Sequence, residues 1–281
     1  MAEVSKVVLI TGCSSGIGQA TAVRLAKAGM KVVATARRTS SLGACEAAGC
    51  AVEALDVDDD ASMVATVERI REKHGTVGVL VNNAGYSQSG AVEEVPMDQV
   101  RRQFETNVFG LVRLCQLVLP GMRRQGSGKI VNLSSMGGRL TFPGGGFYHA
   151  SKYAVEALSD ALRFEVRGFG VEVVVVEPGL IRTGFARTAV GSMGEGSGPY
   201  AGFEAGVART TRENYERGPL AALGGGPEVV AETIERAISA ARPRARYTVT
   251  PSARVLISAR RLLPDRAWDG LLGLFYPRPE G

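Results

Sequence analysis

The N-terminal segment reads Val7-Val8-Leu9-Ile10-Thr11-Gly12-Cys13-Ser14-Ser15-Gly16-Ile17-Gly18. Its first four residues are apolar and mostly β-branched, which predicts a strand buried on both faces of a parallel sheet. A helical pattern follows, so the glycines occupy a turn between strand and helix. Such a turn lets backbone N–H groups approach a pyrophosphate at the helix N-terminus, where the dipole favours negative charge. The spacing G-x-x-x-G-x-G differs from the usual dinucleotide G-x-G-x-x-G, and tight packing alone is the alternative.

Apolar runs of this kind alternate with helical patterns along the rest of the chain. Strands are expected at 31–35, 51–55, 78–81, 129–133, 171–177 and 247–249, with helices around 64–70, 100–124 and 148–166 and after Pro227. Strands that alternate with helices favour a parallel sheet with right-handed crossovers. The sequence therefore predicts a single α/β domain over residues 1–281, a doubly wound parallel sheet of the Rossmann type with helices on both faces.

Two C-terminal segments differ in character from this pattern. Residues 184–226 are Gly-rich with scattered aromatics, and an insertion at the carboxyl side of the sheet is typically a lid or a substrate loop. Residues 252–281 form an extension that combines apolar side chains with arginines. We expect this extension to pack on the domain or on a partner subunit, or to dock on a membrane surface.

Composition excludes several classes of protein. The net charge of +5 is mild and no Lys/Arg run indicates a nucleic-acid partner. No stretch approaches the roughly 20 apolar residues of a membrane span, and no signal peptide precedes the first strand. The four cysteines show neither metal-ligand nor disulfide spacing. We therefore expect a cytoplasmic protein with reduced thiols, no metal and no membrane span, for which peripheral membrane contact stays open.

The segment Tyr148-His149-Ala150-Ser151-Lys152 is the first candidate for chemistry. On a helix, residues i and i+4 share a face, so the Tyr148 phenol and the Lys152 ammonium can point into one space. A phenol has a reference pKa of about 10, and a nearby cation should lower that pKa towards neutrality. The pair suits proton transfer to or from a carbonyl or alcohol oxygen. An ordinary helical tyrosine and lysine are the alternative.

The end of the second strand predicts the cofactor. Dinucleotide folds place an acidic residue about 20 residues beyond the glycines, on the ribose 2′-OH. Here the strand ends at Ala36-Arg37-Arg38 without an acid, and an arginine can pair with a 2′-phosphate. We therefore expect NADP(H) rather than NAD(H), with Arg37 as the main contact and Ser14 as a helper. A merely solvated arginine is the alternative.

Small and polar residues follow other strands. Asp56 could accept a hydrogen bond from an adenine amino group or could serve only a turn. The run Asn82-Asn83-Ala84-Gly85 suits close approach of the backbone to a ligand at a switch point of the sheet. Asn107 stands among apolar neighbours and must find hydrogen-bond partners. Bonding of its amide to the backbone of an adjacent strand is compatible with holding a water near Lys152.

The ordered set of motifs resembles the short-chain dehydrogenase/reductase family. The resemblance covers about 6–183, and it is closest to the hydroxysteroid and retinol dehydrogenase branch. Its motifs are Thr11-Gly12-x-x-x-Gly16-Ile17-Gly18, Asn82-Asn83-Ala84-Gly85, Asn107, Ser135, Tyr148-x-x-x-Lys152 and Pro178-Gly179.

The resemblance implies a role for each matching residue. Tyr148 would be the acid/base, Lys152 would lower its pKa and hold the nicotinamide ribose, and Ser135 would bind the substrate oxygen together with Tyr148. Asn107 would hold the water of a proton relay, and Thr183 would meet the carboxamide. His149 lies outside the pattern and is expected to be structural. The expected cofactor wall comprises Gly12, Ser14, Ser15, Gly16, Ile17, Gly18, Arg37, Asp56, Val57, Asn83, Ala84, Gly85, Tyr148, Lys152, Pro178, Gly179 and Thr183.

The sequence thus predicts an NADP(H)-dependent oxidoreductase that acts on an apolar small molecule. The branch resemblance and the apolar tail favour a large one, such as a steroid, retinoid or polyketide-like ketone. The enzyme would interconvert a secondary alcohol and a ketone, or a primary alcohol and an aldehyde, and would work mainly in reduction because cells keep the NADP pool reduced. The family implies a homodimer or homotetramer formed through the helices that carry Asn107 and Lys152. An NADP(H)-binding regulator without turnover and a membrane-docked lipid enzyme are the alternatives.

Overall fold

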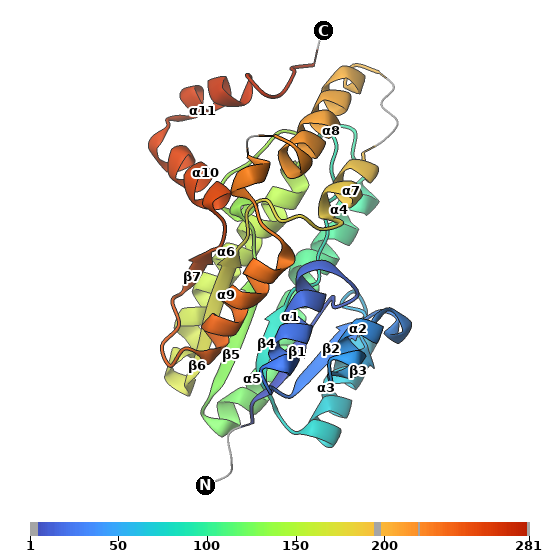
Figure 1. Cartoon of the computed structure of the whole chain (residues 1–281), viewed down its shortest axis with the longest axis vertical. Helices are drawn as coiled ribbons and strands as arrows, with labels where there is room; N and C mark the ends of the chain where they lie inside the picture. Colours follow the sequence, from blue (N-terminus) through green and yellow to red (C-terminus); the bar gives the residue numbers. More distant parts are fainter. Residues whose placement is uncertain (1–4, 194–197, 219, 280–281) are drawn as a thin grey trace.

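The computed structural model describes residues 5–193, 198–218 and 220–279. Its centre is one seven-stranded sheet in the order β3-β2-β1-β4-β5-β6-β7 (Figure 1), with parallel pairing throughout. The reversal of strand order between β1 and β4 is the topological switch point of a doubly wound sheet. The predicted fold class is confirmed. The strands are β1 (Val7–Ile10), β2 (Val32–Ala36), β3 (Ala51–Ala54), β4 (Val77–Asn82), β5 (Gly128–Leu133), β6 (Val171–Glu177) and β7 (Arg246–Thr248).

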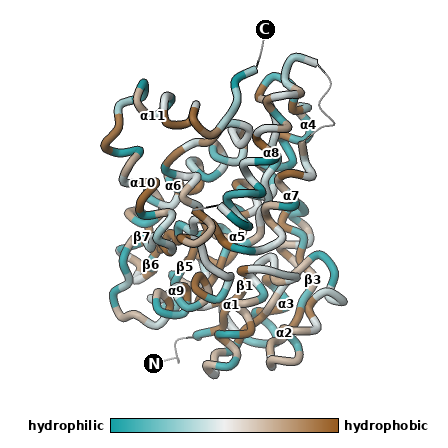
Figure 2. The backbone as a smooth tube through the Cα atoms, turned by 45° about the horizontal axis from the view of Figure 1, so that its top comes forward, coloured by the Kyte–Doolittle hydropathy of each residue, from teal (hydrophilic) through white to brown (hydrophobic). Residues whose placement is uncertain are grey.

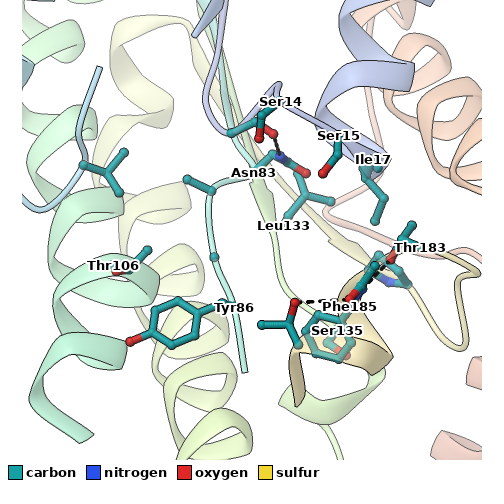
Figure 3. A pocket seen from close by; sticks show the side chains of 18 of the residues that line it. Ser14, Ser15, Ile17, Asn83, Tyr86, Thr106, Leu133, Ser135, Thr183 and Phe185 are labelled. Atoms are coloured by element: carbon teal, nitrogen blue, oxygen red, sulfur yellow. Dashed lines mark hydrogen bonds between the residues drawn. The ribbon is translucent and has the colours of Figure 1, made fainter. Parts of the chain in front are cut away.

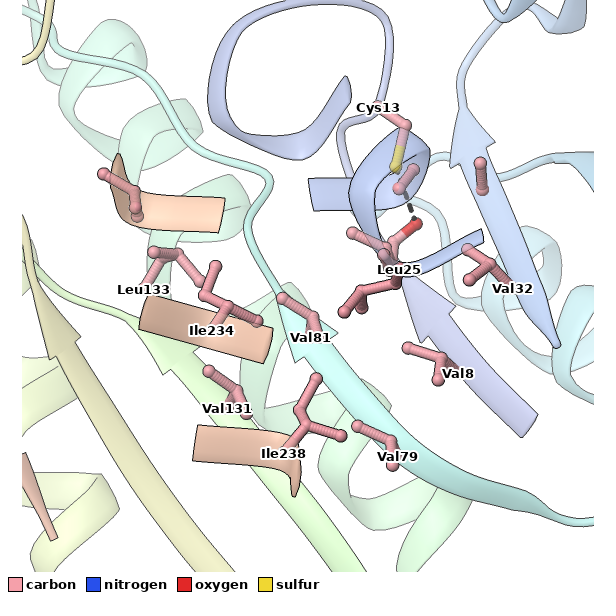
Figure 4. Close-up of a cluster of buried hydrophobic side chains, with 14 of the residues drawn as sticks. Val8, Cys13, Leu25, Val32, Val79, Val81, Val131, Leu133, Ile234 and Ile238 are labelled. Carbon is pink, nitrogen blue, oxygen red and sulfur yellow. Dashed lines mark hydrogen bonds between the residues drawn. The ribbon is translucent and has the colours of Figure 1, made fainter. Parts of the chain in front are cut away.

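Helices cover both faces of the sheet because the strands are apolar on both sides. Val8 and Ile10 of β1 belong to one buried cluster, with α1 (Gly16–Lys27), α2 (Gly43–Ala47) and α9 (Pro227–Ser239) (Figure 4). Val7 and Leu9 belong to the other, with α3 (Asp60–His74), α5 (Gly110–Gln125) and α6 (Gly146–Val166). Alternate side chains of a strand point to opposite faces, so one apolar run fills both cores.

The long helix expected over 100–124 is interrupted. It consists of α4 (Met97–Phe104), a π-helical segment (Glu105–Phe109) and α5. A π-helical turn inserts an extra residue into the helix and is common at functional sites. Asn107 lies in this segment and is buried.

The segment 184–226 is mainly helical, although its composition resembles a loop. Its described residues form α7 (Phe185–Gly191), α8 (Ala201–Glu216) and a 3₁₀ turn at Ala221–Leu223, whereas residues 194–197 and 219 lie outside the described residues. Further 3₁₀ turns lie at Thr39–Ser41, Met136–Gly138 and Arg167–Phe169. Figure 1 shows α7 and α8 at the end of the molecule opposite the N-terminus.

The C-terminal extension packs on the same end of the domain through α10 (Pro251–Leu262) and α11 (Asp265–Leu272). Ile257 and Trp268 join a third buried cluster with Met136, Leu140 and Leu180 of the domain. The extension therefore covers the end of the domain to which the carboxyl ends of the central strands point. Among the helices in the described ranges, none is long and apolar enough to cross a membrane.

Candidate active site

A cavity of about 680 Å³ lies at the carboxyl ends of the central strands, at the switch point (Figure 3). Of the residues expected to act in catalysis or to bind cofactor or substrate, all but two line it. Gly18 and Asn107 lie outside its wall. The expected residues that do line it are Gly12, Ser14, Ser15, Gly16, Ile17, Arg37, Asp56, Val57, Asn83, Ala84, Gly85, Ser135, Tyr148, Lys152, Pro178, Gly179 and Thr183.

The glycine-rich turn takes its shape from backbone conformations that other residues avoid. Gly12 and Gly16 have φ values of +70° and +59°, in the left-handed region that favours glycine. A Cβ on Gly18 would lie 2.3 Å from the Gly12 carbonyl oxygen. Gly18 therefore lets α1 approach the turn, which is a packing role and not the expected place in the wall.

Asn83 and Thr11 fasten this turn to the end of β4. The Thr11 hydroxyl oxygen accepts hydrogen bonds from the backbone N–H groups of Asn83 (3.0 Å) and Ala84 (2.9 Å). The Asn83 amide donates in return to the carbonyl oxygens of Thr11 (2.9 Å) and Gly12 (3.1 Å). In Figure 3, Ser14, Ser15 and Asn83 gather at one end of the cavity. The turn is thereby held in one shape around the N-terminus of α1.

The Asn107 side chain forms hydrogen bonds with the segment just beyond β4 and with α6. Its side-chain oxygen accepts from the Tyr86 N–H (3.0 Å), and its amide donates to the Tyr86 carbonyl (2.9 Å) and to the Ser151 hydroxyl (3.0 Å). A Cβ on Gly85 would lie 3.0 Å from that oxygen and 3.6 Å from the Lys152 ammonium. Gly85 thus leaves room between the two polar groups. Asn107 borders Lys152 although it does not line the cavity.

The part of the cavity wall near α7 contains Ser135, Tyr148 and Lys152. Ser135 caps the short 3₁₀ turn, with its hydroxyl accepting from the Gly137 N–H at 3.0 Å. It also forms a hydrogen bond with the Tyr148 phenol. The Lys152 ammonium donates to the Leu133 carbonyl at 2.8 Å and lies 5.9 Å from the centre of the Tyr148 ring. The expected catalytic side chains are therefore brought together.

The pKa values of this group differ from the expectation. Burial raises the pKa of Tyr148 to about 12, and the hydrogen bond with Ser135 lowers it only in part. Burial lowers the pKa of Lys152 to about 8, against the opposing effect of the Glu156 carboxylate. The expected shift of the Tyr148 pKa towards neutrality is not observed, because desolvation of the buried phenol outweighs the groups that favour the phenolate. Both groups keep their protons at neutral pH.

The part of the cavity near the ends of β2 and β3 is lined by more charged side chains than the sequence analysis predicted. Arg37 lines it directly after β2. Asp56 lies in the wall, and its carboxylate also accepts from the Asp58 N–H at 3.1 Å, so the turn role is observed. Asp58, Arg102 and Thr106 line the cavity too, and the Thr106 hydroxyl donates to Asp58 at 2.9 Å. The sequence analysis missed these three because polar residues on an exposed helix or turn carry no signal for a ligand.

A second cavity of about 140 Å³ adjoins the first and is mainly apolar. Ser135, Tyr148, Phe185 and Tyr215 line both cavities, so the reactive hydroxyls lie at their junction. The Phe185 ring lies 5.2 Å from that of Tyr148. The remaining wall combines segments far apart in the sequence, which no local pattern could have assembled. Its apolar members include Met136, Phe142, Leu180, Val207, Leu256, Trp268, Leu271, Leu272 and Phe275.

His149 holds the loop that carries Ser135 and Phe142. One ring nitrogen, Nδ1, lies 3.1 Å from the Gly137 carbonyl oxygen, and Nε2 accepts from the Phe142 N–H at 3.2 Å. Burial lowers the pKa of His149 to about 4, so the ring is neutral and Nδ1 donates. The structural role predicted for this residue agrees with these contacts, and the ring also lines the apolar cavity.

Comparison with known proteins places this geometry in a family. The family model described as short chain dehydrogenase matches residues 6–192. A 3-ketodihydrosphingosine reductase of Bacteroides thetaiotaomicron is 36% identical over 96% of this chain and 98% of its own length. An NADPH-dependent 3-dehydrocapnine reductase of Ornithobacterium rhinotracheale is 35% identical, covering 93% and 94%. Human 17-beta-hydroxysteroid dehydrogenase type 1 is 35% identical, covering 90% and 80%.

Solved structures agree with the sequence relatives. A short-chain dehydrogenase from Streptomyces avermitilis superposes with a TM-score of 0.80, at 36% identity and 95% coverage of each chain. A serine dehydrogenase complexed with NADP+ gives a TM-score of 0.74 at 27% identity, covering 87% and 94%. A short chain dehydrogenase/reductase from Burkholderia phymatum in complex with NAD gives 0.78 at 27% identity, covering 100% and 99%. The chain belongs to the short-chain dehydrogenase/reductase family of nicotinamide-dependent oxidoreductases.

Proposed function

We propose that the protein is an NADPH-dependent reductase that converts a ketone on an apolar substrate into a secondary alcohol. One observation carries this proposal: Ser135 and Tyr148 line both the large cavity at the switch point and the adjoining apolar cavity. A carbonyl entering from the apolar side would meet both hydroxyls at the junction. Aldehydes that reach the junction would be reduced by the same groups.

The residues of the large cavity fit a nicotinamide dinucleotide. The N-terminus of the twelve-residue helix α1 and the turn at Gly12 and Gly16 offer backbone N–H groups to a pyrophosphate. Arg37 stands where an acid would bind the ribose 2′-OH of NAD, and a guanidinium pairs well with a 2′-phosphate. Lys152 would hold the nicotinamide ribose and Thr183 the carboxamide. When bound, the cofactor supplies the hydride for the carbonyl carbon.

The chain itself supplies the proton and the orientation. Tyr148 donates its phenolic proton to the substrate oxygen, while the Ser135 hydroxyl donates a hydrogen bond to the same oxygen. The charged Lys152 stabilises the phenolate left behind. The room between Asn107 and Lys152 suits a water that returns a proton towards the active site. General acid catalysis of this kind contributes about 100- to 10,000-fold.

The protonation states of Tyr148 and Lys152 near pH 7 suit the reduction step. Because the pKa of Tyr148 is about 12 and that of Lys152 about 8, phenol and ammonium both carry their protons near pH 7. The phenol is then the acid that reduction needs, whereas oxidation needs a phenolate. The NADPH dependence in the name of the Ornithobacterium relative points the same way.

The segment 184–226 acts in this proposal as the lid over the substrate. Phe185 of α7 and Tyr215 of α8 stand at the junction of the cavities, with ring centres 6.3 Å apart. They would press on the substrate close to its reacting carbon and exclude water from it. A homodimer or homotetramer through the helices α4 to α6 is also proposed, since these helices expose apolar side chains such as Phe109, Leu158 and Phe164.

A fluorescence titration with NADPH and NADH tests the cofactor assignment. The wild-type protein should bind NADPH more tightly, and Arg37→Asp should reverse that preference by weakening NADPH binding at least about tenfold. The neighbouring Arg38→Asp variant makes the same change in charge at a residue outside the cavity wall and should keep the preference. An unchanged preference in Arg37→Asp would contradict the assignment.

A further inference from the structure

The C-terminal extension has two different faces. Its inner face closes the apolar cavity through Leu256, Trp268 and Leu271. Trp268 is buried, and the Arg260 guanidinium lies 5.8 Å from its ring centre while also pairing with Asp265 at 2.6 Å. The Arg260 contacts hold α10 and α11 together, and the packing of Trp268 with Met136 and Leu140 fixes the extension on the domain. Its outer face is therefore a defined surface and not a loose tail.

The outer face combines exposed apolar side chains with arginines. Val255 (54% exposed) and Leu262 (83%) are seven residues apart on α10, so they lie on one side of the helix. Each follows an exposed arginine, Arg254 and Arg261. Figure 2 shows the alternation of apolar and hydrophilic stretches along α10 and α11. Large apolar side chains kept exposed beside cations indicate an interaction surface.

This surface continues into the apolar cavity. Phe275 lines the cavity and is 57% exposed, so it marks the mouth. Leu274, next to it, is 78% exposed. Tyr148 lines the same cavity, so an apolar ligand that enters beside Phe275 would approach Tyr148 between mainly apolar walls. A small water-soluble substrate would need no such surface around the entrance.

The charge of the surface selects its partner. Over residues 252–279 the sequence holds five arginines and two aspartates, and Arg254, Arg261 and Arg266 are exposed. A second copy seated symmetrically on this face would bring like charges together, which is unfavourable. An anionic bilayer accepts both kinds of side chain, since arginines bind lipid phosphates and the apolar side chains enter the acyl boundary.

We propose that α10, α11 and residues 273–275, called here the docking surface, bind anionic membranes with the cavity mouth turned towards the bilayer. The substrate is then an amphiphilic lipid ketone whose chain enters past Phe275 and whose carbonyl reaches Ser135 and Tyr148. The substrate part of this inference rests on the proposed reductase function, whereas the membrane part does not. Two relatives, named as a 3-ketodihydrosphingosine reductase and an NADPH-dependent 3-dehydrocapnine reductase, are consistent with this class.

Vesicle co-sedimentation of the full chain tests the membrane part. The protein should sediment with phosphatidylcholine vesicles that contain phosphatidylglycerol, should bind pure phosphatidylcholine more weakly, and should be released by high salt. Arg254→Glu with Arg261→Glu should lower binding at least about 30-fold. The matched control, Arg123→Glu with Arg124→Glu near the end of α5, makes the same change in net charge at other exposed arginines and should bind like the wild type.

A second pair of variants tests the apolar contribution. Leu262→Ser and Val92→Ser each remove one exposed apolar side chain, at 83% and 66% exposure, and only Leu262→Ser should weaken vesicle binding. Absence of wild-type binding, or equal losses in both members of a pair, would overturn the proposal. So would light scattering in which Leu262→Ser alone dissociates an oligomer in solution, because the face would then be a subunit contact.

Activity separates this inference from the reductase assignment. In buffer, the Arg254→Glu/Arg261→Glu variant should reduce a water-soluble ketone at the wild-type rate. With 3-ketodihydrosphingosine in anionic vesicles, the same variant should lose at least about tenfold in rate. Turnover of neither ketone by the wild type would refute the reductase while the vesicle data still decide the docking surface. Equal rates of variant and wild type on the vesicle substrate would refute lipid delivery.

Discussion

Raising the pH from 7 to 9 should slow ketone reduction about tenfold, because Lys152 loses its charge in this range. With a pKa of about 8, the lysine is roughly 90% charged at pH 7 and roughly 10% charged at pH 9. Tyr148, at about 12, stays protonated throughout and contributes no slope. The sign follows from the reaction, because reduction needs the phenol proton and the cation that stabilises the phenolate. kcat/KM should therefore level off below about pH 7, be halved near pH 8 and fall further above it.

The assay is NADPH oxidation followed by absorbance at limiting concentrations of a ketone that does not titrate in this range. Lys152→Arg provides the control, since a guanidinium stays charged above pH 12, and any residual activity of this variant should lack the descending limb. A wild-type profile that stays flat to pH 10, or that descends only near the ordinary lysine pKa, would refute the assignment of a desolvated, catalytically required Lys152.

Two further predictions concern the stability of the site. Lys152→Met should abolish activity and yet raise the free energy of unfolding at pH 7 by about 1–3 kcal/mol, since burial of the ammonium lowers its folded pKa and disfavours folding below about pH 8. Wild-type stability should rise with pH between 8 and 10.5, where the unfolded chain binds more protons, and urea titrations should find this rise missing in Lys152→Met. A less stable Lys152→Met at pH 7 would contradict the burial cost. Gly18→Ala should lower stability by about 1–3 kcal/mol and weaken NADPH binding, because its Cβ would lie 2.3 Å from the Gly12 oxygen. Gly168→Ala, with no atom within 4 Å of the added Cβ, should be close to neutral in thermal unfolding and in NADPH titration, and equal effects at both positions would refute the packing role of Gly18.

The sheet could be predicted because its determinants are local. Apolar runs such as Val7–Ile10 and Val171–Glu177 indicate strands buried on both faces, and each lies within a residue or two of its predicted position. Alternation with helices then fixes a parallel sheet. The helices of 184–226 were missed because glycines and short apolar spacings obscure helical periodicity, and their packing on the domain decides their conformation.

Much of the candidate site could also be predicted, since its motifs follow strand ends that a parallel sheet brings to one edge. The rise in the pKa of Tyr148 could not be predicted, because its desolvation depends on Phe185 and Tyr215, which a segment distant in the sequence supplies. The same holds for the apolar cavity, where Trp268 of the extension meets Met136 of the domain. Such contacts join residues whose separation in the chain hides them from any local pattern.

The most direct test of the central claim compares wild-type protein with Tyr148→Phe. NADPH oxidation is measured with a panel of apolar ketones, and NADPH binding is measured on the same samples. The account predicts wild-type turnover with NADPH, a loss of about 100- to 10,000-fold in Tyr148→Phe, and NADPH affinity within about threefold of the wild type. Full turnover by Tyr148→Phe, or NADPH binding without wild-type turnover on any carbonyl, would contradict a reductase that uses Tyr148 as its acid.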